Sequence, residues 1–419
     1  MGGRGYETLE AAINAAAGTT ATITLMRDIG VSSRIPVSAS DITLTGGETN
    51  YVITNANNTV NFTFFDLAEG SNFTLDKGVT LQGGRVQVKS GAALFLKDGA
   101  KITGNTIFGR SVMVYEGGTF TMEGGSIEGN TSTTIAGGVY NNGTFIMRGG
   151  SINVNTAYND DSGSGSGGGV YVNSTGTFTM KGGEINSNTA GTGGGGVYVS
   201  STGTFTMEGG SIGDNSIYSM GYTGSTIDYK GGGVYNGGTF TMKDGSSISL
   251  NQVDAVCHTK TSWESSYGSG GGVYNDGTFT MEGGSIEENS VYADHANSES
   301  ASYAWGGGVY NAGTFTMQDG SISRNEASAD LAFLNDSYAY GGGVYLDSDS
   351  VITKTGGTIN GNTVYSKNNA GAEEVYVNCT GNPVNPVRLE NPVEADHNLT
   401  KATDDDTADE LTFNKGWTE

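Results

Sequence analysis

The feature that most constrains this chain is a repeat. One unit reads Gly-Gly-Val-Tyr, a short turn, and then Thr-Phe-Thr-Met-x-Gly-Gly-Ser-Ile-x-x-Asn, with a close copy between Gly137 and Asn155. A degenerate copy from Leu94 to Asn105 places Leu94 where the other copies have Phe. Copies of the unit end at Asn130, Asn155, Asn188, Asn215, Asn251, Asn289, Asn325 and Asn362. A repeat of this length predicts an architecture in which each unit packs only on its neighbours.

The pattern inside a unit predicts short strands rather than helices. Phe and Met are two residues apart with Thr beside them, which is the period of a strand with one buried face. Three short strands with Gly-rich corners bury little alone, but units stacked at about 4.8 Å share a continuous core. We therefore predict an all-β fold, a right-handed parallel β-helix of about 10–13 coils with three sides and a short N-terminal capping helix.

Stacked coils predict ladders of identical side chains. We expect the Phe residues to point inward from Phe120 to Phe315, with Met122 to Met317 beside them and Ile127 to Ile322 on the next strand. The Asn residues that end each unit should form a ladder at a corner, bonding through their amides. The residue after each Met alternates in charge, as in Lys181 and Glu208, which predicts structural ion pairs.

The ends of the chain differ from the repeats. Residues 6–17 are the one good helical stretch, and Leu9, Ile13 and Ala16 fall on one face. We expect residues 1–20 to cap the first coil, 21–377 to form the β-helix with insertions at one corner, and 378–419 to form a C-terminal cap or linker. Cys257 and Cys379 are close enough for a disulfide only if the insertion that holds Cys257 crosses several coils.

Charge and hydropathy exclude some partners. With 44 acidic and 20 basic residues the formal charge is −24, which repels nucleic acid and anionic lipid. No apolar stretch is long enough for a membrane span, so we expect no direct membrane insertion. The three His residues share no metal-ligand spacing, and no calcium-binding Gly-Asp repeat occurs. We expect no cofactor and no metal.

The tetrapeptide-like motifs Gly-Gly-Val-Tyr and Ser-Ile-x-x-Asn carry a resemblance. From Leu94 to Asn378 the chain resembles the repeats of polymorphic outer-membrane proteins and, more broadly, the β-helix adhesins of bacterial surfaces. It departs from the former in having Ile where that family has Phe before x-x-Asn. The resemblance implies a β-helix and adhesion to a host surface.

Insertions of irregular length separate each Asn from the next Gly-Gly. They span residues 131–136, 156–166, 189–192, 216–230, 252–269, 290–305 and 326–340. Because they occupy one corner of successive coils, the last four should form a contiguous raised patch. Its aromatic residues, among small polar ones, resemble the composition of antibody binding loops. The alternative is that they pack the insertions onto the wall of the solenoid. The candidate ligand-binding residues are Tyr218, Tyr222, Tyr229, Trp263, Tyr267, Tyr292, Tyr303, Trp305, Phe333, Tyr338 and Tyr340.

Two other surfaces are candidates. The Tyr of Gly-Val-Tyr, from Tyr140 to Tyr345, forms an outward stripe if Val points inward, and such a stripe either binds sugar rings or stacks structurally. The Thr residues that flank each Phe form two outward columns, which resemble those of ice-binding β-helices, although Thr is also simply a good strand residue.

An enzymatic role as a polysaccharide lyase or hydrolase is a further alternative. Such chemistry needs clustered carboxylates, with a basic residue or metal, or an acid and a base across a glycosidic bond. Outward strand positions here are Thr and Tyr, and Asp244 and Asp319 lie in non-adjacent coils. Only insertion residues such as Asp254, Asp294 and Asp330 have a chance to converge. No catalytic residues are therefore predicted.

These observations favour a binding module over an enzyme. We expect a monomeric surface adhesin that recognises a host surface or secreted protein, such as an immunoglobulin, or a glycan through its insertions. An extracellular location follows from this expectation, either secreted or anchored to a cell surface.

Overall fold

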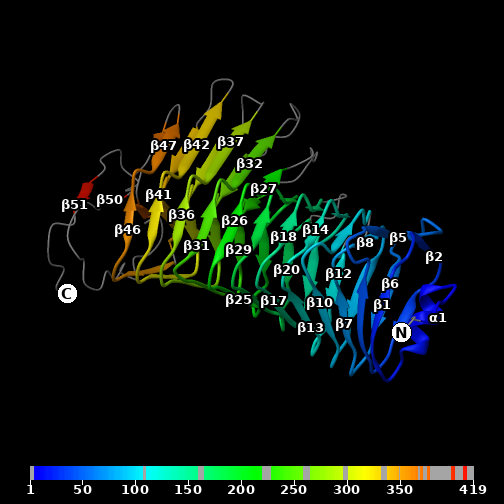
Figure 1. Ribbon diagram of the computed structural model, residues 1–419. Helices are drawn as coiled ribbons and strands as arrows, with labels where there is room; N and C mark the ends of the chain where they lie inside the picture. Colours follow the sequence, from blue (N-terminus) through cyan, green and yellow to red (C-terminus); the bar gives the residue numbers. More distant parts are fainter. Residues whose placement is uncertain are drawn as a thin grey trace.

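The chain winds into a long parallel β-helix (Figure 1). The computed structural model describes residues 4–106, 110–158, 165–218, 228–257, 265–295, 301–331, 337–348 and 350–366, with short strands at 369–370, 375–377, 398–401 and 409–412. Three long sheets form its walls, and consecutive strands along the chain belong to different sheets, except the last three described strands, which share one sheet. The predicted three-sided parallel β-helix is confirmed.

We name the three walls after the residues that they carry. The Phe sheet contains, in order, β1 (Thr20–Thr24), β4 (Asp41–Thr45), β7 (Asn72–Leu75), β10 (Ala93–Leu96), β13 (Thr119–Met122), β17 (Thr144–Met147), β21 (Thr177–Met180), β25 (Thr204–Met207), β30 (Thr239–Met242), β35 (Thr278–Met281), β40 (Thr314–Met317) and β45 (Val351–Lys354). The Ile sheet contains β2 (Ile29–Val31), β5 (Tyr51–Asn55), β8 (Val79–Gln82), β11 (Lys101–Thr103), β14 (Ser126–Glu128), β18 (Ser151–Asn153), β22 (Glu184–Asn186), β26 (Gly210–Gly213), β31 (Ser246–Ser249), β36 (Ser285–Glu287), β41 (Ser321–Ser323) and β46 (Thr358–Asn360).

The third wall is the Val-Tyr sheet. It contains β3 (Ile35–Val37), β6 (Thr63–Leu67), β9 (Arg85–Val88), β12 (Val112–Val114), β16 (Val139–Asn141), β20 (Val170–Val172), β24 (Val197–Val199), β29 (Val234–Asn236), β34 (Val273–Asn275), β39 (Val309–Asn311), β44 (Val344–Leu346), β49 (Val375–Val377), β50 (Asn398–Lys401) and β51 (Asp409–Thr412). All described strand pairs are parallel except β50 with β51.

Identical residues stack in register from coil to coil. Phe120 pairs with Phe145 and Ile127 pairs with Ile152. The seven Phe rings are fully buried and lie parallel, with neighbouring centroids 4.5–4.8 Å apart. Leu94 pairs with Phe120, as its place in the degenerate copy predicts. Each buried Phe or Ile contributes about 1.5–3 kcal/mol, so the core gains stability with every added coil.

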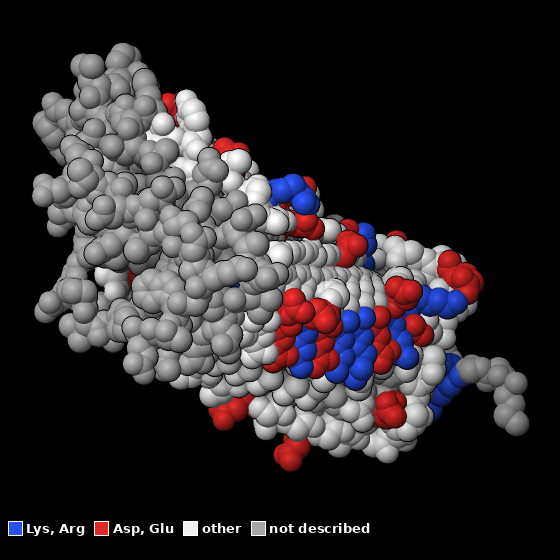
Figure 2. Space-filling view, turned by 90° about the vertical axis from the view of Figure 1, so that its left-hand side faces the viewer, with Lys and Arg blue, Asp and Glu red and all other residues white. Residues whose placement is uncertain are grey.

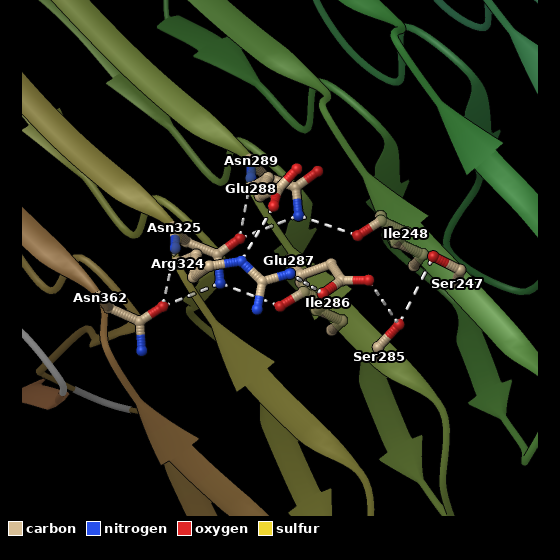
Figure 3. Close-up of polar contacts among 10 residues, drawn as sticks. All are labelled: Ser247, Ile248, Ser285, Ile286, Glu287, Glu288, Asn289, Arg324, Asn325 and Asn362. Carbon is tan, nitrogen blue, oxygen red and sulfur yellow. Dashed lines mark hydrogen bonds and ion pairs between the residues drawn. The ribbon is translucent and has the colours of Figure 1, made fainter.

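The Asn ladder is the polar counterpart of this core. The Nδ2 of Asn289 donates to Oδ1 of Asn325 and to the carbonyl oxygen of Ile248, each at 2.9 Å (Figure 3). The backbone N–H of Asn289 donates to the same Oδ1 at 3.0 Å. These contacts repeat from Asn105 to Asn362, with the side chains almost completely buried. The predicted ladder is confirmed, and it closes the corner after the Ile sheet without unsatisfied amides.

The residue before most ladder Asn residues has a left-handed backbone. Val154, Leu250 and Arg324 have φ between 53° and 58°. Left-handed backbone costs a residue with a Cβ roughly 1–2 kcal/mol, so the buried Asn hydrogen bonds must outweigh this strain. The turn also directs these side chains outward, and Val154 and Leu250 are more than half exposed. Figure 3 shows Arg324 reaching back toward Glu287 and Glu288 of the neighbouring coil.

Glycine at the next corner is required by close packing of the coils. A Cβ on Gly195 would lie 2.3 Å from the carbonyl oxygen of Gly232, and one on Gly196 would lie 2.8 Å from that of Gly233. Backbone of the next coil occupies that space, so a side chain cannot be accommodated by a rotamer change.

Opposite charges from neighbouring coils lie side by side on the outer surface. Lys181 Nζ lies 2.8 Å from Glu208 Oε2, and Lys97 lies 3.8 Å from Glu123. Figure 2 shows basic and acidic side chains side by side in bands on one surface of the solenoid. The side chains in these two pairs are about 35–46% exposed, so each pair contributes little stability on its own.

A short helix lies at the N-terminal end (Figure 1). It is α1 (Leu9–Ala15), shorter than the helix predicted over residues 6–17, and the Thr8 hydroxyl caps it by accepting from Ala11 N–H at 3.1 Å. Leu9, Ile13 and Ala16 are buried against the first coil, as their common face predicts. Most of residues 378–419 lie outside the described residues, as does Cys379.

Replacing Asn215 tests the Asn ladder. Asn215→Ala removes the acceptor for two N–H groups of Asn188 and the donor to Ile185, and it leaves those buried groups unpaired. We expect the variant to lose about 2–5 kcal/mol of stability, measured as a lower midpoint in thermal or urea unfolding.

Asn186→Ala is the matched control. Asn186 lies on the outer face of β22, and its side chain bonds to Glu184 at 3.3 Å. Its loss should change stability by no more than about 0.5 kcal/mol. Equal effects of the two substitutions would contradict the role given to the ladder.

Candidate functional site

The insertions at the corner after the Asn ladder fold into two further parallel sheets. The long fin sheet contains β15 (Thr131–Ser132), β19 (Thr156–Ala157), β23 (Thr189–Ala190), β27 (Ser216–Tyr218), β32 (Gln252–Cys257), β37 (Ser290–His295), β42 (Glu326–Leu331) and β47 (Thr363–Ser366). The short fin sheet contains β28 (Asp228–Lys230), β33 (Ser266–Ser269), β38 (Ser302–Trp305), β43 (Ser337–Tyr340) and β48 (Asn369–Ala370). We call the two sheets together the fin.

The fin rises from one edge of the solenoid. Figure 1 shows β32, β37, β42 and β47 standing above the main walls in the C-terminal half. The last four insertions contribute neighbouring strands, so the predicted contiguous patch is present, although as sheets rather than as irregular loops.

Small apolar side chains hold the two fin sheets together. Ala255 and Ala293 of the long fin sheet are fully buried with Ala304 and Ala339 of the short one. This cluster is separate from the core inside the three walls. Strand alternation therefore turns the larger residues of both sheets outward.

The outer face of the short fin sheet carries a second aromatic ladder. The rings of Tyr267, Tyr303 and Tyr338 are parallel within 6°, with neighbouring centroids 4.8 and 5.0 Å apart. Rings stacked in this way cover one another's faces. The ladder therefore presents ring edges outward, not the flat faces on which a sugar ring stacks.

Trp305 joins this ladder to the wall. Its ring lies 5.3 Å from that of Tyr303 and 5.7 Å from that of Tyr345 in the Val-Tyr sheet. Tyr340 also packs against the Tyr274, Tyr310 and Tyr345 cluster. Trp305 and Tyr340 thus fill the angle between the fin and the Val-Tyr sheet. This is the alternative predicted from the sequence, in which the aromatic residues pack the insertions onto the solenoid.

The Tyr residues of Gly-Val-Tyr face outward from the core. The preceding Val residues are fully buried inside, and the rings stack from Tyr140 to Tyr345 with centroids 4.5–5.8 Å apart. Tyr274, Tyr310 and Tyr345 are at most 7% exposed because the fin covers them. Arg110 lies 4.8 Å from the ring of Tyr140 and Lys230 5.1 Å from that of Tyr274, which are cation–π distances.

Burial perturbs the acidity of this Tyr ladder. It raises the pKa of Tyr171 to about 12, with smaller contributions from Tyr198 and Tyr140. Burial also raises the pKa of Tyr235, Tyr274 and Tyr310. The hydroxyl of Tyr310 donates to Asp347 Oδ2 at 2.9 Å. These four Tyr residues therefore stay protonated and able to donate hydrogen bonds throughout the physiological range.

The outer face of the long fin sheet combines an aromatic residue with carboxylates. Tyr292 pairs with Asp254 on one neighbouring strand, and Asp294 pairs with Asp330 on the other. Burial raises the pKa of Tyr292, and the nearby charges of Asp294, Asp330 and Asp254 raise it further. The Oδ1 atoms of Asp254 and Asp294 are buried beside this residue, so the face combines an aromatic ring with partly covered carboxylates.

The structure places the predicted ligand-binding residues in different environments. Tyr267, Tyr292, Tyr303 and Tyr338 lie on the outer faces of the fin, and Tyr218 is 42% exposed at the end of β27. Tyr229 is buried between the fin sheets. Tyr222, Trp263 and Phe333 lie outside the described residues.

The two columns of Thr residues predicted from the sequence can also be placed in the structure. The Thr columns lie on the outer face of the Phe sheet, with Thr204 and Thr206 in register with Thr239 and Thr241, but Ile146 interrupts one column. Within the described part of the chain, no three His, Cys, Asp or Glu side chains come together to hold a metal ion.

Sequence reasoning missed a second Asn ladder beside the Tyr ladder. Asn236 Nδ2 donates to Asn275 Oδ1 at 2.7 Å, and Asn275 Nδ2 donates to Asn311 Oδ1 at 2.6 Å. The signal was present, because these coils read Gly-Val-Tyr-Asn where others read Gly-Val-Tyr-Val.

Comparison with protein-family models, with curated proteins and with solved structures finds no significant match to this chain. No helix among the described residues is long and apolar enough to cross a membrane. The fold and the fin therefore have to be interpreted from their own geometry.

The raised pKa of Tyr171 predicts a pH dependence of stability. An unfolded Tyr titrates near 10, so between about pH 10 and 12 the folded state binds more protons than the unfolded state. Stability is therefore full below pH 10 and falls as pH rises toward 12. We expect Tyr171→Phe to remove part of this alkaline loss, on the order of 1–2 kcal/mol, in urea unfolding at pH 8 and pH 11. Identical losses in the variant and the parent would contradict the assignment.

Proposed function

We propose that this chain is an extracellular binding module of the adhesin kind, and that its fin holds the ligand. The observation that carries the proposal is the separation of two apolar clusters, one inside the three walls and one inside the fin. The coil with the shortest insertion, at residues 189–192, still pairs with both neighbours in every wall. The long insertions are therefore not needed to close the solenoid.

The outer faces of the fin support recognition of a polar surface. One face carries the stacked Tyr267, Tyr303 and Tyr338, and the other carries Tyr292 among carboxylates. Tyr supplies a large contact area and a hydrogen bond at low cost in side-chain entropy. Stacking hides most ring faces, so hydrogen bonding along ring edges is favoured over sugar-ring stacking.

This geometry favours a protein ligand over a neutral glycan. The stacked Tyr rings form an extended row that repeats at the spacing of the coils, and a protein surface offers several hydrogen-bonding groups along a row of that extent. We propose that the partner is a host surface or secreted protein and that the module binds it outside the cell.

Substitutions on the short fin sheet test this proposal. Binding of the full chain is measured on an array of host surface proteins, secreted proteins and glycans, and affinities are determined for the ligands found. We expect the double variant Tyr303→Ser and Tyr338→Ser to weaken binding at least tenfold, because it removes two adjacent members of the ladder.

The control variant is Thr278→Ser with Thr314→Ser, on the outer face of the Phe sheet. It should bind as tightly as the parent. Absence of any ligand on the array, or equal affinity of the two double variants, would refute the fin as the binding site.

A further inference from the structure

A polar hollow of about 290 Å³ lies at the corner between the Ile sheet and the Val-Tyr sheet, in coils that precede the fin. It is lined by residues of three successive coils, among them Asn55, Gln82 and Asn105. Asn105 is also the first residue of the Asn ladder, so the hollow occupies the same corner from which the fin rises farther along. Its volume is near the lower end of the range for small-molecule sites, about 300–1,000 Å³.

Arg85 is the charged residue of this hollow. It is partly buried at the start of β9, where Nε donates to Thr63 Oγ1 and an Nη donates to the carbonyl oxygen of Asn61, both at 3.2 Å. These bonds hold the guanidinium in place and leave other N–H groups available, since Arg has five. Burial lowers the pKa of Arg85, Tyr115 raises it, and the nearby positive charge of Arg110 lowers it.

No carboxylate faces this guanidinium from the lining. The lining residues include no Asp or Glu, and no ion pair between described residues involves Arg85. The chain as a whole has 44 acidic residues against 20 basic ones, yet none of the acidic residues pairs with Arg85 among the described ion pairs. A buried cation without a counter-ion is costly, and an anionic ligand would remove that cost.

The rest of the lining suits the hydroxyls and the ring of a sugar. Asn58 and Gln82 offer exposed amides, which can both donate to and accept from hydroxyl groups. Val60, which is 51% exposed, and Phe62 provide apolar surface for the C–H face of a ring. The hollow thus combines one cationic group, several neutral polar groups and a small apolar patch.

The loop of residues 55–62, which forms one side of the hollow, is held by its own hydrogen bonds. Asn55 Nδ2 donates to the carbonyl oxygens of Thr59 at 2.8 Å and Gly83 at 3.1 Å. Asn58 and Asn61 adopt left-handed backbone, with φ of 49° and 64°, which Asn tolerates better than most residues. These bonds hold the loop in one conformation, which reduces the entropy lost on binding.

We propose that this hollow binds a carboxylate-bearing sugar, a hexuronic acid or a sialic acid, with Arg85 pairing with the carboxylate. The amides of Asn58 and Gln82 contact the hydroxyls. The site is separate from the ligand-binding face proposed for the fin and does not depend on it.

The test uses the full chain, with calorimetry and ligand-observed NMR as readouts. The probes are galacturonate, glucuronate, N-acetylneuraminate, neutral galactose and inorganic phosphate. We expect at least one acidic sugar to bind at least tenfold more tightly than galactose and phosphate. Arg85→Gln should lower its affinity at least tenfold, and Arg148→Gln, an exposed Arg elsewhere on the solenoid, should not change it.

A second variant covers the case in which Arg85→Gln fails to fold. Gln82 is exposed, so Gln82→Glu should fold normally while it places a carboxylate on the lining of the hollow. We expect it to abolish binding of the acidic sugar, while Gln318→Glu, at an exposed position far from the hollow in sequence, should not. Equal binding of galactose or phosphate, no binding of any acidic sugar, or unchanged affinity in Gln82→Glu would each overturn the proposal.

Discussion

The whole structure depends on register between neighbouring coils. Backbone pairing along three walls places like residues over like, and each buried Asn then bonds to the Asn of the next coil and to a carbonyl group of the coil before. These bonds determine which residue can stand at the corner. They also make a one-residue slip costly, because it would turn every buried Phe, Met and Ile outward while orphaning the amides. The left-handed residues before the Asn are tolerated because this network fixes them.

Register also explains how one corner can vary so widely. After the Asn that follows a strand of the Ile sheet, the chain needs only to reach the Gly residues that precede the next strand of the Val-Tyr sheet. Residues 189–192 make this connection in a short segment. Longer excursions in successive coils lie beside one another and therefore pair as strands of the fin. The fin inherits the spacing of the solenoid, which is why its Tyr residues stack at nearly the same distance as the buried Phe residues. The solenoid thus supports a surface whose composition is not dictated by the core.

The repeated part of the fold could be predicted from the sequence because the residues of each ladder recur in every copy of the repeat unit. Phe, Met, Ile and Asn recur at fixed offsets, and only stacking in register explains them all. The insertions were harder, since their lengths differ, yet Ser302-Tyr303-Ala304-Trp305 and Ser337-Tyr338-Ala339-Tyr340 already show the alternation of strands. The hidden ring faces could not be predicted, because ring orientation depends on packing rather than on spacing. Arg85 gave no signal either: its partners Asn61 and Thr63 lie a whole coil away in sequence, and the hollow exists only once three coils are stacked.

Removal of one complete coil tests most directly the claim that nearest-neighbour register specifies this structure. Deleting residues 170–196 joins Gly169 to Val197. Val197 is in register with Val170, so it takes the place of the residue that normally follows Gly169. The deletion brings Asn155 next to Asn215 and Phe145 next to Phe205, each replacing an identical partner. We predict a folded chain with the β-sheet circular dichroism of the parent and a cooperative thermal transition at a similar or slightly lower temperature. A chain that is unfolded or aggregated after this in-register deletion would contradict the account.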